Sequence, residues 1–212
     1  MTTPEPADRV LARASLAEGN PTAWFDQLYT AAARGEAEVP WTRGTPNADL
    51  AAWVRPGEGR RALVVGSALG DDAELLSAAG WAVTAFDVAP TAVEAARTRF
   101  PESEVDYVVA DLLNPPSQWR QAFDLVVEII NIQAMPREFR PAAVASLAGF
   151  LAPGGTALVS EVAEESTGVE AWEGPPWPFS RAEIESVAQD GVRLVSLETI
   201  RDGDRYWATF TR

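Results

Sequence analysis

The sequence contains neither cysteine nor histidine in its 212 residues. These two absences exclude disulfides, thiolate nucleophiles and metal sites built from cysteine and histidine, and they exclude a Ser-His-Asp triad. We therefore expect no bound metal. Any catalysis has to use carboxylates, tyrosine, basic side chains, backbone groups or the reactivity of a cofactor.

Basic residues are also few, since 17 of them stand against 31 acidic residues and the formal net charge is −14. Such a surface repels phosphate backbones and anionic lipids, which argues against nucleic acid or a membrane surface as a partner. No run approaches the ~18 apolar residues of a membrane-spanning helix, and the opening MTTPEPADRV has no apolar signal-peptide core. We expect a cytoplasmic protein, a monomer or weak homodimer, with a small-molecule substrate.

Apolar strands and helices alternate from Arg61 onwards. Strands are predicted at 61–66, 82–87, 105–111, 123–129 and 156–162, with helices between them at 71–79, 90–99 and 138–150. This alternation indicates a parallel sheet covered on both faces. Strands at 193–200 and 205–212 flank Asp202-Gly203-Asp204, a turn typical of an antiparallel hairpin. The predicted fold is α/β: a Rossmann-like, seven-stranded, mostly parallel sheet with helices on both faces, a C-terminal antiparallel hairpin and an N-terminal helical lid.

The predicted division of the chain is an arm and helical lid over 1–56 and the sheet domain over 57–212. Within the arm, residues 1–20 are expected to be a frayed helix or disordered. Apolar residues at helical spacing predict a helix over 22–34, and Asn47 or Asp49 can start a short one. Further on, Pro153-Gly154-Gly155 is expected to end the helix before the fifth strand, and Ser180 with Glu183 reads as a capping box.

The turn after the first strand is made of small residues, Gly66-Ser67-Ala68-Leu69-Gly70. In an open parallel sheet, ligands lie beyond the carboxyl ends of the strands, and small residues let the backbone approach them. A dinucleotide fingerprint needs glycine at 66, 68 and 71, whereas this chain has Ala68 and Asp71. An acid at that helix N-terminus opposes a pyrophosphate and suits a cationic ligand without phosphates, which disfavours a nicotinamide-dependent oxidoreductase. A tight strand–helix turn without a ligand is the alternative.

Three further acids follow three further strands. Asp87 can accept both hydroxyls of a ribose, and Asp111 can accept from an adenine amino group while Leu112 covers the ring. Glu128, near the end of the fourth strand, lies where a substrate or the reacting part of a cofactor is expected. The alternative for each acid is a structural one, in which it caps a helix, loop or turn.

Together these positions resemble the class I S-adenosylmethionine-dependent methyltransferases, over residues 39–212. Two segments are similar to the thiopurine and halide/thiol methyltransferase group. The first is Pro40-Trp41-Thr42-Arg43-Gly44, and the second is Gly174-Pro175-Pro176-Trp177, followed by Ser180-Arg181-Ala182-Glu183-Ile184. Ala68 departs from the usual middle glycine, and Ile129 and Ile130 follow Glu128 where the group often has arginine or tyrosine, so a thiopurine substrate is not implied.

The resemblance implies S-adenosyl-L-methionine as the cofactor and a lid formed by Trp24 or Tyr29 with Trp41. The methionine part would lie along the turn after the first strand, the ribose at Asp87 and the adenine at Asp111. The full set of cofactor-binding residues expected in this way is Trp41, Gly66, Ser67, Ala68, Gly70, Asp71, Asp87, Val88, Asp111, Leu112 and Glu128.

The expected reaction is methyl transfer to a small, largely apolar acceptor. A sulfonium carries its own activated methyl, so a soft, easily ionised nucleophile needs no strong base. A thiol is therefore the first choice, and N- or O-methylation of an aromatic metabolite and a non-catalytic cofactor-binding module are the alternatives. If a base is needed, Glu128 or Tyr29 is expected to supply it. The expected pocket walls are Trp24, Ile129, Asn131, Ile132, Gln133, Met135, Trp172 and Trp177.

Overall fold

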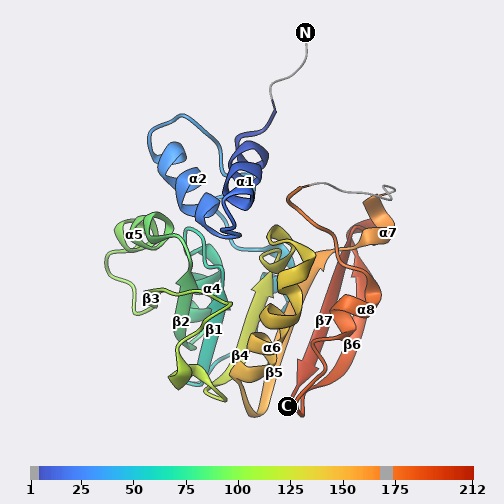
Figure 1. Cartoon of the computed structure of the whole chain (residues 1–212). Coiled ribbons are helices and arrows are strands. Elements are labelled where there is room, and N and C mark those ends of the chain that lie inside the picture. Colours follow the sequence, from blue (N-terminus) through green and yellow to red (C-terminus); the bar gives the residue numbers. More distant parts are fainter. Residues whose placement is uncertain (1–4, 168–173) are drawn as a thin grey trace.

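Seven strands form one mixed sheet in the order β3-β2-β1-β4-β5-β7-β6 (Figure 1). The computed structural model describes residues 5–167 and 174–212. Strands β1 to β5 are parallel, and β7 lies antiparallel between β5 and β6. The strands are β1 (Arg61–Val65), β2 (Ala82–Asp87), β3 (Asp106–Val109), β4 (Phe123–Ile129), β5 (Leu151–Val162), β6 (Arg193–Ile200) and β7 (Arg205–Thr211). The predicted Rossmann-like sheet with its C-terminal antiparallel hairpin is confirmed.

Helices cover both faces of this sheet and its upper end (Figure 1). The α-helices are α1 (Ala7–Ala17), α2 (Ala23–Ala33), α3 (Ala48–Trp53), α4 (Asp71–Ala78), α5 (Pro90–Arg99), α6 (Arg140–Phe150), α7 (Glu164–Thr167) and α8 (Arg181–Glu185). Short 3-10 helices are η1 (Ser117–Trp119), η2 (Ile132–Ala134), η3 (Arg137–Phe139) and η4 (Arg201–Gly203). None of the helices in the described part of the chain is long and apolar enough to cross a bilayer.

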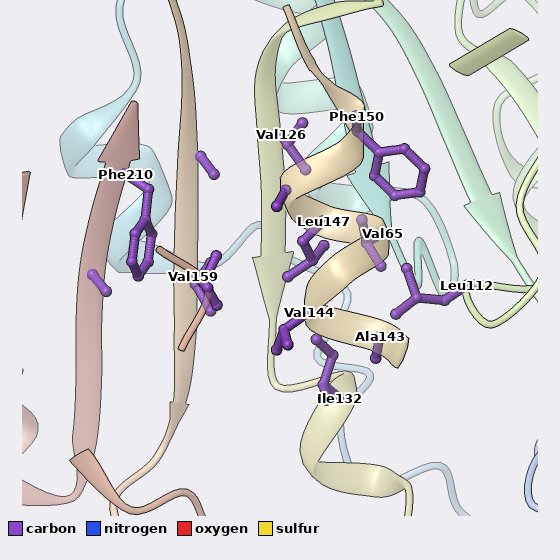
Figure 2. Packing of buried hydrophobic residues seen from close by; sticks show 14 of the residues in the cluster. Val65, Leu112, Val126, Ile132, Ala143, Val144, Leu147, Phe150, Val159 and Phe210 are labelled. Carbon is purple, nitrogen blue, oxygen red and sulfur yellow. The ribbon is translucent and has the colours of Figure 1, made fainter. Parts of the chain in front are cut away.

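Alternation along the strands divides the core into two layers. Side chains two residues apart lie on the same face of a strand, so Leu63 and Val65 pack on the α6 side while Ala62 and Val64 pack on the α4 side. Figure 2 shows the first layer, in which α6 residues such as Leu147 face the strands. Strands buried on both faces account for the nearly continuous apolar runs in the sequence.

The predicted bounds of the fifth and third strands differ most from the structure. Residues 153–155 do not end a helix, because β5 already begins at Leu151, which pairs with Phe123 of β4. The next paired residues are Leu125 and Thr156, so five steps along β5 stand opposite two along β4. Pro153, Gly154 and Gly155 therefore form a bulged excursion within the strand. Strand β3 is shorter than predicted and covers only Asp106–Val109.

The N-terminal region is helical and lies over the carboxyl ends of the parallel strands (Figure 1). In place of a frayed or disordered arm, α1 buries Ala12 and Ser15 against its surroundings. Asn47 caps α3, since its side chain accepts hydrogen bonds from the N–H groups of Asp49 and Leu50. The capping box of Ser180 and Glu183 is also present at the start of α8.

Candidate functional site

A cavity of about 650 Å³ lies where α2 meets the carboxyl ends of β1 to β4. It is the place at which a parallel sheet of this topology offers loops to a ligand. The lining residues are Thr22, Phe25, Tyr29, Trp41, Gly66, Phe86, Asp87, Val88, Ala110, Asp111, Leu112, Ile129, Ile130, Asn131, Ala134 and Met135. Most of these walls are apolar, and two carboxylates stand among them.

Gly66 and Ala68 shape the turn after β1. Both have left-handed backbones, with φ of 63° and 46°. A Cβ on Gly66 would lie 2.3 Å from Oδ1 of Asn131, so a side chain at this position requires Asn131 to move. Ala68 holds a conformation that a residue with a Cβ rarely adopts, and its N–H donates to Oδ2 of Asp87 at 3.0 Å. Ala68 therefore adopts a left-handed backbone that glycine would adopt with less strain.

Asp87 is the buried acid at the end of β2, with a relative exposure of 7%. Its carboxylate accepts from the N–H of Ala68 and from that of Ala89, each at 3.0 Å. Burial raises the pKa of Asp87 to about 6, against the lowering effect of these amides. A carboxylate has about four acceptor positions, so acceptor capacity is left for hydroxyl groups in the cavity.

Asp111 and Leu112 follow β3 and line the same cavity. Oδ1 of Asp111 accepts from the N–H of Leu113 at 2.8 Å, which fixes the loop. Leu112 is buried, with a relative exposure of 5%, and belongs to the α6-side core. The structure thus brings Asp111 and Leu112 into the same cavity wall as Trp41 and Met135.

Three aromatic residues close the cavity on the α2 side. Nε1 of Trp41 donates to the hydroxyl of Tyr29 at 2.8 Å, and Phe25 packs edge-on against Trp41. The pKa of Tyr29 is raised well above 10, because the residue is buried and lies near Asp87. Trp24, the other expected lid residue, is 1% exposed; it stacks on Phe25 and lines neither of the two cavities described here.

The acids at the start of α4 are already engaged. Asp71 forms a two-pronged ion pair with Arg99, with N–O distances of 2.7 and 2.8 Å. Asp72 accepts from the N–H of Asn47 at 2.6 Å, and burial raises its pKa. Arg99 therefore compensates Asp71, and Asp72 anchors the segment before α3; that Asp71 favours a cationic ligand stays a prediction.

Glu128 does not line the cavity. It is fully buried, and its Oε1 accepts from the N–H groups of Asn131 and Ile132 at 2.9 and 3.0 Å. Its side chain points to the α6 face because it lies two residues after Val126. The carboxylate stabilises the turn after β4, which carries Ile130 and Asn131 into the cavity wall. The expected direct contact of Glu128 with cofactor or substrate is corrected accordingly.

The expected pocket walls divide into two groups. Ile129, Asn131 and Met135 line the cavity as expected. Ile132 is fully buried in the core, and Gln133 is held by the main chain of Val162, so neither faces the cavity. The N–H of Trp177 donates to the carbonyl of Gln133 at 2.6 Å, and Trp177 lines neither cavity. Trp172 lies outside the described residues.

A second cavity, of about 980 Å³, adjoins the first and was missed by the sequence reasoning. Trp41, Gly66, Ile129 and Ile130 line both. Its remaining walls come from the segment before α3, from β1 and its turn, and from the β6–β7 connection. They are Thr42, Arg43, Thr45, Pro46, Asn47, Ala48, Val64, Val65, Ser67, Ala68, Leu69, Asp71, Asp72, Val127, Arg201 and Arg205. Gly70 lies beneath the turn, where a Cβ would come within 2.3 Å of the Tyr107 hydroxyl.

The comparisons with known proteins agree with this geometry. Residues 62–155 match a family model described as a methyltransferase domain. That stretch runs from β1 to the bulge of β5 and includes the turn at Gly66 and the acids after β2, β3 and β4. No curated protein matches the sequence.

Solved structures share the fold at low sequence identity. N-methyltransferase NodS of Bradyrhizobium japonicum WM9, in complex with S-adenosyl-L-homocysteine, is 20% identical with a TM-score of 0.67, over 88% of this chain and 99% of that one. The 1,6-didemethyltoxoflavin-N1-methyltransferase of Burkholderia thailandensis, with bound 1,6-didemethyltoxoflavin and S-adenosylhomocysteine, is 17% identical with a TM-score of 0.66, over 100% and 92%. A protein studied for the conversion of a disulfide bond into a thioacetal group in echinomycin biosynthesis is 20% identical with a TM-score of 0.71, over 89% and 93%. At these identities the likeness is one of fold.

Proposed function

We propose that this protein is a class I S-adenosylmethionine-dependent methyltransferase and that it methylates a thiol or another soft heteroatom of a small molecule. The proposal depends on the state of the four carboxylates that line the two cavities: Asp71 pairs with Arg99, Asp72 accepts from the N–H of Asn47, and Asp87 and Asp111 are assigned to the donor, which leaves none to remove a proton from the acceptor. An acceptor that ionises unaided is then required.

The proposed donor site is the first cavity. Asp87 would accept the ribose hydroxyls, and Asp111 would accept from the adenine amino group while Leu112 covers the ring. The methionine part would lie along the Gly66 turn under Trp41. Ser67, Ala68, Gly70 and Asp71 remain proposed neighbours of the donor through their backbone, and Val88 remains one as a wall residue of the first cavity.

The shortage of bases follows from the state of each candidate. Tyr29 keeps its proton, because burial and Asp87 raise its pKa well above 10. Asp71 is paired with Arg99, and Glu128 is buried behind the turn after β4. An acceptor with a poorly acidic hydroxyl therefore finds no base to remove its proton. A thiol acceptor, with an ordinary pKa near 8.5, provides enough thiolate by itself.

The proposed transfer needs orientation and exclusion of water more than acid–base chemistry. The thiolate sulfur forms a bond to the methyl carbon as the bond from that carbon to the sulfonium sulfur breaks, and S-adenosylhomocysteine leaves with the electron pair. Apolar side chains line this region, among them Phe25, Ile129, Ile130 and Met135. Their low polarity favours a reaction in which opposite charges cancel.

An amine acceptor is the second candidate. Two of the structural neighbours are N-methyltransferases, and an amine with its free lone pair also attacks without a base in the site. A methylated amine product would require a proton to leave afterwards to water, which does not depend on a side chain of this chain.

Transfer of labelled methyl from S-adenosylmethionine tests the proposal. A panel of thiols, amines and phenols, matched in size, is offered between pH 6 and 9, with product identified by mass. Thiols are expected to react fastest, with a rate that rises with the thiolate fraction. Faster phenol methylation, or label that binds and is never transferred, would contradict it.

A further inference from the structure

The second cavity gathers arginines in a chain that is acidic overall. Arg43, Arg201 and Arg205 all line it, although acidic residues outnumber basic ones by 31 to 17 in the sequence. Arg43 precedes α3, whereas Arg201 and Arg205 lie at the β6–β7 connection. They lie together because β7 runs antiparallel beside β5. The start of β7 is therefore at the edge of the sheet where the parallel strands end.

Two of these arginines have no carboxylate within ion-pair distance among the described residues. Arg201 pairs with Asp49, at 2.6 Å between Nη2 and Oδ2. Within residues 5–167 and 174–212, no hydrogen bond or ion pair joins Arg43 or Arg205 to an acid. Burial lowers the pKa of Arg205, and the positive charges of Arg201 and Arg43 lower it further, while the weaker effects of Glu161 and Asp49 raise it. Like charges are thus held together beside a cavity.

The acids of the same wall do not offset this charge in full. Asp71 is compensated by Arg99, and Asp72 accepts from a backbone N–H of the loop before α3. A further polar group is free: Ser67 has a relative exposure of 6%, and its hydroxyl has no hydrogen-bond partner in the described structure. A buried hydroxyl without a partner costs free energy, and a ligand oxygen in the adjoining cavity could satisfy it.

We infer that this second cavity, bounded by Arg43, Arg205 and the Ser67 hydroxyl, binds a carboxylate carried by the methyl acceptor. Guanidinium and carboxylate are planar groups that pair through two parallel hydrogen bonds. Gly66, Trp41, Ile129 and Ile130, which line both cavities, then mark the passage through which the acceptor's nucleophile meets the donor's methyl. The inference rests on the proposed methyl transfer and adds a charge to the substrate class.

The carboxylate could also be that of the donor's own methionine part, and a binding experiment separates the two sources. The full chain is titrated by calorimetry with S-adenosylhomocysteine and with 5′-methylthioadenosine, which lacks the amino-acid group. The variants are Arg205→Met and, as a matched control, Arg193→Met, an exposed arginine at the start of β6. If Arg205→Met weakens the first ligand by about ten-fold and leaves the second unchanged, the arginine holds the donor and the inference is overturned.

The second experiment measures binding of two analogues of a methylated product to protein saturated with S-adenosylhomocysteine. One analogue, 4-(methylthio)benzoate, carries a carboxylate, and the other, 4-(methylthio)benzyl alcohol, is uncharged. The acid is expected to bind about ten-fold more tightly than the alcohol, the scale of one charge-assisted hydrogen bond. Arg205→Met should reduce that ratio to about two-fold or less, and Arg193→Met should keep it. Equal binding of the two analogues, no binding of the acid, or a ratio that survives Arg205→Met would overturn the inference.

This second experiment requires no turnover, so its result is separate from that of the proposed thiol chemistry. Selective binding of the acid at Arg205 without methylation of any thiol would leave the inference standing and contradict the thiol acceptor. Methylation of neutral thiols, with no preference for acids, would support the thiol acceptor and contradict the carboxylate site.

Discussion

Glu128 and Glu161 bring two buried carboxyl groups close together across the neighbouring strands β4 and β5. Both residues are fully buried. Oε1 of Glu128 accepts from the N–H groups of Asn131 and Ile132, and Oε1 of Glu161 accepts from that of Gln133. Neither Oε2 has a hydrogen-bond partner in the described structure. We expect one proton to be held between the two carboxyl groups, because it would satisfy both oxygens and leave the pair with one negative charge rather than two.

The first prediction is that the protein becomes less stable as the pH rises from 5 to 8. Burial raises the pKa of Glu128 from 4.5 to about 7, and burial together with Glu128 raises that of Glu161 well above its usual value. A group with a raised pKa binds its proton more tightly when folded, so its stabilising effect is complete below pH 4.5 and is lost as the pH passes the folded value. Urea unfolding at several pH values measures this loss, expected at roughly 1–3 kcal/mol.

Glu161→Gln is expected to flatten that pH dependence and to raise stability at pH 8. The amide can keep its oxygen on the N–H of Gln133 and donate from Nε2 to Glu128 in place of the shared proton. Glu138→Gln, at an exposed position, is the matched control and should leave the slope unchanged. An unaltered slope in Glu161→Gln would show that the pair does not share a proton in this range.

A second prediction concerns Asp87. Asp87→Ala should weaken S-adenosylhomocysteine binding by roughly 1.5–3 kcal/mol, the scale of a hydrogen bond to a charged group. Asp87→Asn, which keeps an acceptor for the N–H of Ala68 or Ala89, should lose less stability while still losing affinity. Because the pKa of Asp87 is about 6, wild-type affinity should also fall below that pH. Calorimetry measures both effects.

The control for these variants is Asp106→Asn, an exposed aspartate at the start of β3. It lies at the end of the sheet away from the cavity and should bind the ligand as the wild type does. If folded Asp87→Asn retains full affinity at all pH values, Asp87 is not a ligand of the ribose.

A third prediction uses two glycines with similar backbones. Gly66 has φ of 63° and Gly59 has φ of 78°, but a Cβ on Gly66 would lie 2.3 Å from Asn131 whereas nothing lies within 4 Å at Gly59. Gly59→Ala should lose about 1 kcal/mol from backbone strain alone. Gly66→Ala should lose a further ~1–3 kcal/mol, because Asn131 has to move, and donor binding should weaken with it. Equal losses in urea unfolding would mean that Asn131 yields without cost.

A fourth prediction is that Tyr29 is not a base. Its hydroxyl accepts from Nε1 of Trp41 and keeps its own proton, since its pKa is raised well above 10. Tyr29→Phe should therefore leave the pH–rate profile unchanged and lower kcat by no more than about three-fold, with about 1 kcal/mol of stability lost through the missing hydrogen bond. A loss of a hundred-fold, together with a shifted profile, would restore Tyr29 as a general base.

The sequence was a good guide where local rules act. Periodicity gave β2, β4 and β6 with their observed bounds, and the caps at Asn47 and Ser180 followed from side chains that bond their own helix starts. The carboxyl ends of the strands also drew attention to Asp87 and Asp111, since every parallel strand ends on the same edge. The sequence did not reveal that Glu128 is buried and lines neither cavity. The direction of a side chain near a strand end depends on how the following turn packs against the sheet.

By itself, then, the sequence determined the alternation of strands and helices, the sharp turns and the absence of imidazole and thiol, all of which depend on residues near one another in the chain. Only the tertiary structure decided which charges meet. Arg201 binds Asp49 across 152 positions, Arg99 neutralises Asp71, and Glu128 finds Glu161 on the next strand. Such pairs depend on strand order and on burial, and neither leaves a local pattern in the sequence because long-range contacts follow from the packing of the whole chain.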